Sequence, residues 1–133
     1  MKNQQGFTLI ELIVVLTIMA IIGATIVPVF LNRTDRARLQ SDIQSARVLQ
    51  NAMELYNAEN ATSLQPNIDA IFERLIERNF IQDTIRETQT SGASWVFDAG
   101  RIKVDIRGLE SIIAIAADLP EHDKAWVVGL PAS

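Results

Sequence analysis

Residues 6–31 read GFTLIELIVVLTIMAIIGATIVPVFL, and Glu11 is the only charged side chain among them. As an α-helix, the apolar run 7–31 rises about 37 Å, enough to cross the roughly 30 Å hydrocarbon core of a bilayer. The alternative is a buried core helix. The remaining residues, about 100 of them, are too few to cover a helix that is apolar on every side. The run therefore predicts a membrane-spanning helix.

The composition of the whole chain narrows the class of protein. It has 133 residues, 48% hydrophobic and 21% charged, a balance typical of a globular rather than a disordered protein. Cysteine is absent, which excludes disulfides and thiolate chemistry, and the single His122 excludes a multi-histidine metal site. The net charge is +2 over residues 32–38 and −6 over residues 39–133. An acidic body argues against direct nucleic-acid binding. No cofactor or metal is expected.

The segment before the apolar run is unlike a secretory signal peptide. Residues 1–6 are short and polar, and residues 32–34, Asn-Arg-Thr, make a poor cleavage site after the run. A carboxylate inside hydrocarbon, as at Glu11, is costly and usually marks function. Cleavage after Gly6 would place the new amine of Phe7 at almost the same depth. The amine of one subunit could then pair with Glu11 of another; the alternative is a carboxylate that is protonated or reaches out to water.

At these residues the chain resembles a known family. Gly6-Phe7-Thr8-Leu9-Ile10-Glu11 followed by an apolar run is similar to the processing signature of type IV pilins and type II secretion pseudopilins. By this resemblance a prepilin peptidase cuts after Gly6 and N-methylates Phe7, and Glu11 takes part in subunit assembly. Pro28 matches a proline common in that helix. The close resemblance covers residues 6–31, and a looser one extends to about Ile81.

The resemblance implies a function and a set of partners. The precursor is expected to sit in the bacterial cytoplasmic membrane and to polymerise through its N-terminal helix into a type IV pilus or a type II secretion pseudopilus. The implied partners are other copies of the chain in a helical filament, the prepilin peptidase, an inner-membrane assembly platform with its ATPase, and membrane lipid before assembly. The C-terminal body then faces away from the cytoplasm, although the positive-inside rule leans weakly the other way.

The helical pattern continues beyond the apolar run. One apolar stripe follows, with helical spacing, at Leu39, Ile43, Ala46, Leu49, Met53 and Tyr56. A single helix over about residues 7–56 is expected, and the alternative is a break near residues 32–34. Gly23 and Pro28 are weak points of this helix. By resemblance, this stretch loses helicity when subunits pack in a filament; a tolerated kink is the alternative.

The remaining chain predicts a small α+β body. Asn67 is a plausible N-cap for a second helix at about residues 68–78. Strands are expected at 94–98 and 101–107, joined by a turn at Ala99-Gly100, and further strands at 111–117 and 125–128. The expected fold is type IV pilin-like: the long helix packs on a small antiparallel sheet. The chain then divides into a cleaved leader (1–6), a transmembrane and filament-core helix (7–31), and an amphipathic continuation with a globular domain (32–133).

No catalytic motif is present, so an enzyme is not expected. Asp118, Glu121 and Asp123 are interpreted as a solvated acidic loop, with calcium binding as the alternative. Residues 60–62, Asn-Ala-Thr, fit a glycosylation sequon of high false-positive rate. The aromatic side chains are expected in the core, namely Trp95, Phe97 and Trp126. The basic residues after the membrane run contact lipid headgroups or neighbouring subunits, or are merely solvated: Arg33, Arg36 and Arg38.

Two other classes of function are considered. A single-span anchored binding domain that does not polymerise is the main alternative, and Glu11 within the span argues against it. A membrane-anchored hydrolase is opposed by the lack of a nucleophile–base motif. The lack of cysteines departs from pilins with a C-terminal disulfide and favours a pseudopilin or a cysteine-free pilin.

Overall fold

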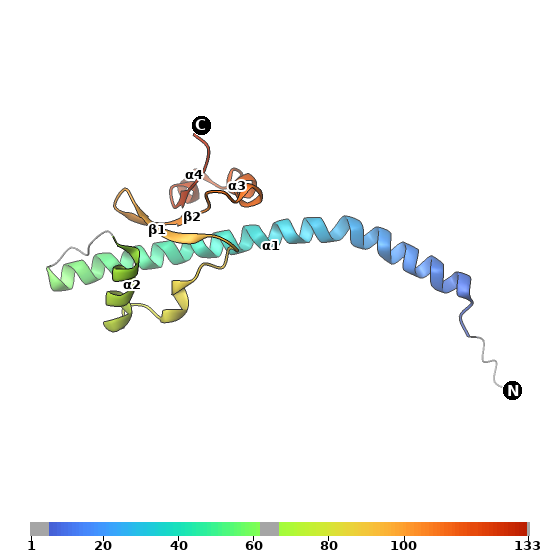
Figure 1. Ribbon diagram of the computed structural model, residues 1–133, viewed down its shortest axis with the longest axis horizontal. Coiled ribbons are helices and arrows are strands. Elements are labelled where there is room, and N and C mark those ends of the chain that lie inside the picture. Colours follow the sequence, from blue (N-terminus) through green and yellow to red (C-terminus); the bar gives the residue numbers. More distant parts are fainter. Residues whose placement is uncertain (1–5, 62–66, 133) are drawn as a thin grey trace. The chain divides into compact units, whose positions relative to one another are not determined.

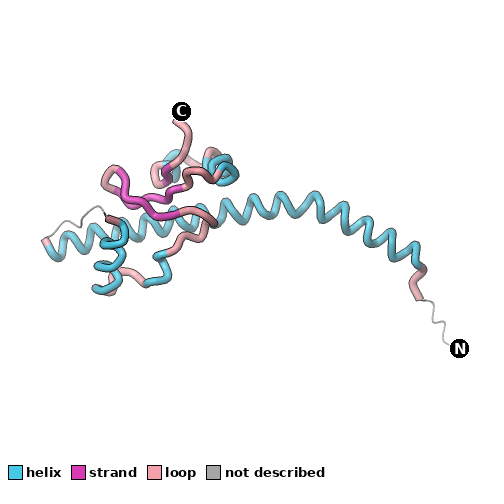
Figure 2. The backbone as a smooth tube through the Cα atoms, viewed as in Figure 1, coloured by secondary structure: helices cyan, strands magenta, loops and turns pink. Residues whose placement is uncertain are grey.

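The computed structural model describes residues 6–61 and 67–132 (Figure 1). The chain divides into two compact units, Met1–Thr34 and Asp35–Ser133. Helix α1 (Leu9–Asn60) is continuous in secondary structure, so the alternative of a break near residues 32–34 is wrong (Figure 2). It begins two residues later and ends four residues later than expected. Apart from Gly6, the predicted leader lies outside the described residues.

The first unit presents its apolar side chains outward. No side chain of residues 6–34 is buried, and α1 is long and apolar enough here to cross a membrane. The threonines of this helix bond to carbonyls one turn back: Thr17 Oγ1 donates to the Ile13 carbonyl at 2.7 Å. Polar groups satisfied within the helix are what a hydrocarbon surrounding requires. The helix also continues through Pro28, so the predicted flexibility at Gly23 and Pro28 stays a prediction.

The second unit is built on the remainder of α1. The six residues of the predicted stripe, from Leu39 to Tyr56, are all buried, which confirms the amphipathic interpretation. They form one core with strand residues such as Ile102 and Val104. Tyr56 contacts Phe80 edge to face, with ring centroids 5.7 Å apart. The second half of α1 therefore forms one side of the hydrophobic core of the second unit.

Helix α2 (Ile68–Glu77) begins as predicted. The Asn67 side-chain oxygen accepts hydrogen bonds from the N–H groups of Asp69 and Ala70, at 3.0 and 3.4 Å, which satisfies two of the helix's free donors. Ile71, Phe72 and Leu75 face the core. A short 3₁₀ helix, η1 (Asp83–Arg86), follows and was not predicted.

The sheet is three-stranded, in the order β1–β2–β3. β1 (Ser94–Asp98) and β2 (Arg101–Asp105) form the predicted antiparallel hairpin, with Trp95 opposite Val104, although β2 ends two residues early. β3 (Val127–Val128), within the predicted strand 125–128, pairs with β2 in parallel. The sheet is therefore mixed, and the expectation of a wholly antiparallel sheet is wrong.

The predicted strand at 111–117 is also wrong. This segment forms helix α3 (Glu110–Ala116), and α4 (Glu121–Lys124) follows it. Ile112 and Ala116, one turn apart, are its buried residues. The two helices form the crossover that a parallel connection from β2 to β3 needs. The missed helices and the missed parallel pairing are therefore linked, because the helices form the connection that brings β3 beside β2 in the same direction.

Two buried polar side chains of α1 fix the body to the helix. Asp42 is 1% exposed, and its two carboxylate oxygens accept the backbone N–H groups of Gln89 and Thr90 at 2.6 and 2.7 Å. The Gln50 side-chain oxygen accepts the N–H of Ile102 in β2 at 3.0 Å. The bonds to Thr90 and Ile102 satisfy backbone donors that burial would otherwise leave unpaired.

Candidate processing and assembly site

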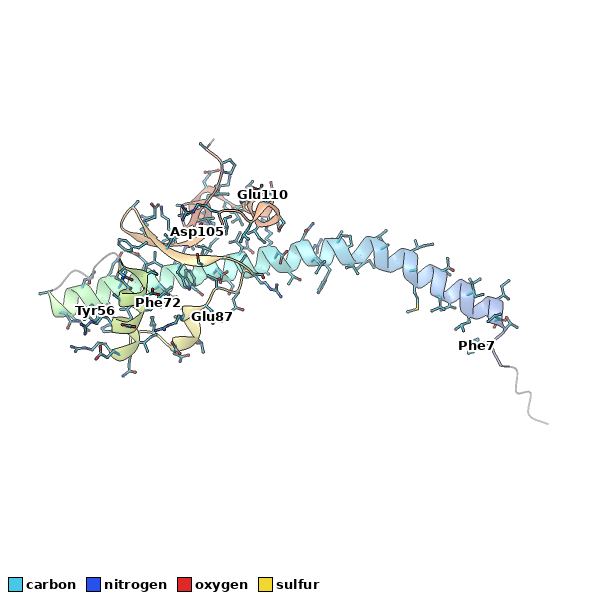
Figure 3. The ribbon with its side chains drawn as sticks, viewed as in Figure 1. Phe7, Tyr56, Phe72, Glu87, Asp105 and Glu110 are labelled. Carbon is cyan, nitrogen blue, oxygen red and sulfur yellow. The ribbon has the colours of Figure 1, made fainter. Side chains whose placement is uncertain are left out.

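The residues of the predicted cleavage site lie just before α1. Gly6, Phe7 and Thr8 are exposed and are not helical, and the helix begins at Leu9. The side chain of Phe7, labelled in Figure 3 where the helix starts, is 90% exposed. The Gly6–Phe7 peptide bond is thus exposed and outside regular structure.

Thr8 is the N-cap of α1. Its carbonyl accepts the first helical bond from the N–H of Leu12 at 3.2 Å, and its Oγ1 accepts the N–H of Glu11 at 3.3 Å. These two bonds define an N-cap with its side chain engaged. Sequence reasoning missed this role, although Thr8-x-x-Glu11 fits the capping-box pattern.

Glu11 lies in the first turn of α1. It is exposed, and no cation contacts its carboxylate within the described residues. Together with Phe7, Ile10, Val14 and Val15 it lines an open, shallow hollow of apolar walls. A lone carboxylate among apolar side chains is costly to place in hydrocarbon unless a cation pairs with it.

Gly23 and Pro28 lie further along α1 and take no part in this hollow. A Cβ built on Gly23 would meet no atom within 4 Å, so no close packing within this chain requires a glycine there. Their predicted role in filament packing concerns a state that a single chain does not display.

The acidic loop differs from its interpretation as wholly solvated. Asp118 and Glu121 are exposed, but Asp123 is 9% exposed and its carboxylate accepts a hydrogen bond from Arg47 Nη2 at 2.6 Å. Glu121 pairs with Lys124 at 2.9 Å. Across residues 6–61 and 67–132, no three acidic or histidine side chains gather as a metal site would require. Asp123 is a structural partner of α1.

The aromatic residues are divided between core and rim. Trp95 is buried and its Nε1 donates to the Ile85 carbonyl at 3.1 Å, which confirms its core placement. Phe97 and Trp126 are half-buried against the core. The guanidinium carbons of Arg47 and Arg101 lie 5.8 and 5.3 Å from the Trp126 ring centre, within the range of cation–π attraction.

Two further predicted features are the glycosylation sequon and the basic residues that follow the membrane run. In the sequon, Asn60 Nδ2 donates to the Tyr56 carbonyl at 2.9 Å, and Thr62 lies outside the described residues. The basic residues Arg33, Arg36 and Arg38 are all exposed. Arg38 approaches Asp35 at 3.8 Å, a weak surface pair.

The N-terminal part of the chain is similar to known proteins. Residues 1–27 match the family model described as the prokaryotic N-terminal methylation motif. The type II secretion system core protein G of Vibrio cholerae is 33% identical over 78 residues, which are 59% of this chain and 52% of that relative. The core protein G of Pseudomonas aeruginosa is 31% identical over 75 residues, 55% of this chain and 53% of the relative.

A third relative is named for its processing. The prepilin peptidase-dependent protein A of Clostridium perfringens is 47% identical over 62 residues, 47% of this chain and 44% of that protein. The matches thus span about half the length of the curated relatives. No solved structure matches the chain. The methylation motif, these relatives and the α+β fold with its long N-terminal helix support the pseudopilin and type IV pilin-like family for this chain.

Proposed function

We propose that the chain is a filament subunit of the pseudopilus kind, made as a membrane-inserted precursor. In this proposal residues 1–6 are removed by cleavage after Gly6, and Phe7 is N-methylated. Residues 7–31 first span the cytoplasmic membrane and then form the filament core, and residues 32–133 form the body outside the cytoplasm. The chain is a substrate of processing enzymes and not an enzyme itself.

One observation carries the proposal: among the residues that the structure describes, no cation pairs with the carboxylate of Glu11, which lies close to Phe7 in a stretch of α1, residues 9–31, that is otherwise uncharged. Cleavage after Gly6 would create an ammonium group at Phe7. Two opposite charges in a low-dielectric surrounding attract strongly, and pairing the Phe7 amine of one copy with Glu11 of the next removes both unpaired charges together. Such a pairing links subunits in a fixed register.

The relatives favour a secretion pseudopilus over a surface pilus. Two of those described are named as type II secretion core proteins, and the third is named as dependent on a prepilin peptidase. By analogy we propose that peptidase, an inner-membrane assembly platform and its ATPase as partners, with membrane lipid surrounding the helix before assembly. The filament itself is built from copies of this chain.

The test is Glu11→Gln, which keeps the shape of the side chain and removes its charge. The precursor should accumulate in the membrane while the yield of sheared fibres, counted by electron microscopy, falls at least tenfold. Glu59→Gln, an exposed carboxylate near the other end of α1, is the control and should leave the yield unchanged. Normal fibre yield from Glu11→Gln would refute the charge pairing.

Processing is tested separately by the intact mass of the protein extracted from membranes. The expected mass lacks residues 1–6 and carries one additional methyl group. An uncut chain in cells that contain the peptidase would overturn the processing step. Cleaved protein that never forms fibres, even when overproduced with the platform, would instead favour an anchored binding domain.

A further inference from the structure

We infer that Thr8 is a positioning residue for cleavage of the precursor. Its side chain fixes the start of α1 at Leu9 and so keeps the Gly6–Phe7 peptide bond outside the helix. This inference rests on the proposed cleavage after Gly6 and adds the residue that prepares that bond for the peptidase.

The contacts of Thr8 carry the first step. The first N–H groups of a helix have no carbonyl partner within it. The Thr8 hydroxyl oxygen accepts the N–H of Glu11 at 3.3 Å, so one of these donors is satisfied by a side chain. A helix that began one turn earlier would lose this bond, because residue 8 would then lie inside the helix. The hydroxyl therefore favours one starting point among several.

The second step concerns the scissile bond. Hydrolysis adds water to the Gly6 carbonyl carbon and breaks its bond to the Phe7 nitrogen, giving a carboxylate on Gly6 and an amine on Phe7. In a helix extended through residue 6, the Gly6 carbonyl oxygen would accept the N–H of Ile10 and be shielded by the surrounding turn. In the structure Gly6 and Phe7 are exposed and not helical. The cap thus keeps the reacting carbonyl accessible.

The third step separates the two roles of Glu11. Its backbone N–H is bound by Thr8, while no cation contacts its carboxylate within the part of the chain that the structure describes. The cap therefore leaves that carboxylate available for the amine that cleavage releases. In this inference Thr8 keeps the Gly6–Phe7 bond accessible for cleavage, and the Glu11 carboxylate pairs with the amine that cleavage releases.

The experiment follows the initial rate of cleavage of the membrane-inserted full chain by prepilin peptidase, normalised to the amount of precursor on an immunoblot. Thr8→Val keeps the shape of threonine but has no hydroxyl, and should be cut measurably more slowly, with about fivefold as the upper limit set by the loss of an N-cap bond of about 1 kcal/mol. Thr8→Ser and Thr8→Asn, which can both cap, should be cut at close to the wild-type rate. Thr17→Val, which removes a hydroxyl inside the helix, is the control.

A second readout is structural. In detergent micelles, amide exchange at Ile10 should be slower in Thr8→Val, because the extended helix would bond the Ile10 N–H to the Gly6 carbonyl, and should return to normal in Thr8→Ser. A wild-type cleavage rate for Thr8→Val would overturn the inference, as would an Asn variant as slow as Val, since the peptidase would then be reading the shape of threonine. A wild-type chain left uncut after Gly6 would instead overturn the proposed function.

Discussion

Replacing Asp42 should destabilise the second unit more than any surface change. Its carboxylate holds the N–H groups of Gln89 and Thr90 at 2.6 and 2.7 Å, and the residue is 1% exposed. Hydrogen bonds to a charged group contribute about 1.5–3 kcal/mol each, and Asp42→Ala would also leave the buried N–H of Thr90 without an acceptor. The expected loss in the free energy of unfolding is about 3–5 kcal/mol.

Asp42→Asn sharpens the prediction because it preserves shape. Its single carbonyl oxygen can accept one N–H, while its amide group would face the other N–H, donor against donor. We expect a loss of about 2–3 kcal/mol. A loss equal to that of Asp42→Ala would show that the negative charge and not the number of acceptors matters.

The assay is urea unfolding of the detergent-solubilised full chain, followed by tryptophan fluorescence. Both tryptophans, Trp95 and Trp126, lie in the second unit, so the signal reports on that unit. Glu73→Gln, an exposed carboxylate of α2, is the control and should change stability by less than about 0.5 kcal/mol. Amide exchange at Gln89 and Thr90 should accelerate in both Asp42 variants. A loss below about 0.5 kcal/mol for Asp42→Ala would refute the reasoning.

Two further predictions concern the turns around β2. Gly129 has φ +112°, and an added Cβ would lie 2.8 Å from the Arg107 backbone nitrogen, so Gly129→Ala should lower the free energy of unfolding by about 2–4 kcal/mol in the same assay. Gly100 has φ +78° and open space around it, so Gly100→Ala should lower the free energy of unfolding by only about 1 kcal/mol. Equal losses for the two variants would contradict the steric argument. The side-chain hydrogen bond from Arg107 holds the pKa of Asp105 below its usual 3.8, so this contact contributes stability above pH 3.8 that is lost as the pH falls through the lower pKa of the folded state. Arg107→Gln should return the Asp105 pKa toward 3.8 in a carboxyl NMR titration, and an unchanged pKa would rule the contact out as its cause.

The long helix and its buried stripe could be predicted from the sequence because helical spacing and apolar character coincide from Leu39 to Tyr56. Asp42 and Gln50 lie on that same face, but a pattern of hydrophobic residues does not identify them as buried because they are polar. Polar residues embedded in an apolar stripe were the available signal: such groups are kept only when they bond to something. Their partners lie 47 to 52 residues away, beyond what a local pattern reveals.

The C-terminal part was harder for a physical reason. Ile112, Ile113 and Ile115 favour a strand by propensity, yet α3 forms because tertiary packing overrides a weak preference in a seven-residue segment. The direction of β3 depended on that helix and was therefore missed with it. At the N-terminus, the roles of Gly6, Phe7 and Glu11 are implied by the family resemblance and stay predictions, whereas the cap by Thr8 required the helix boundary to be known.

The apolar surface of residues 7–31, interrupted only by the charge of Glu11, has a consequence for how a subunit could leave the membrane. Such a helix is poorly soluble in water, so a subunit that polymerises as proposed would pass from lipid directly into contact with other copies, without a dissolved pool between the two states. Growth of a fibre would then be governed by how quickly chains leave the bilayer, rather than by any free concentration beyond it.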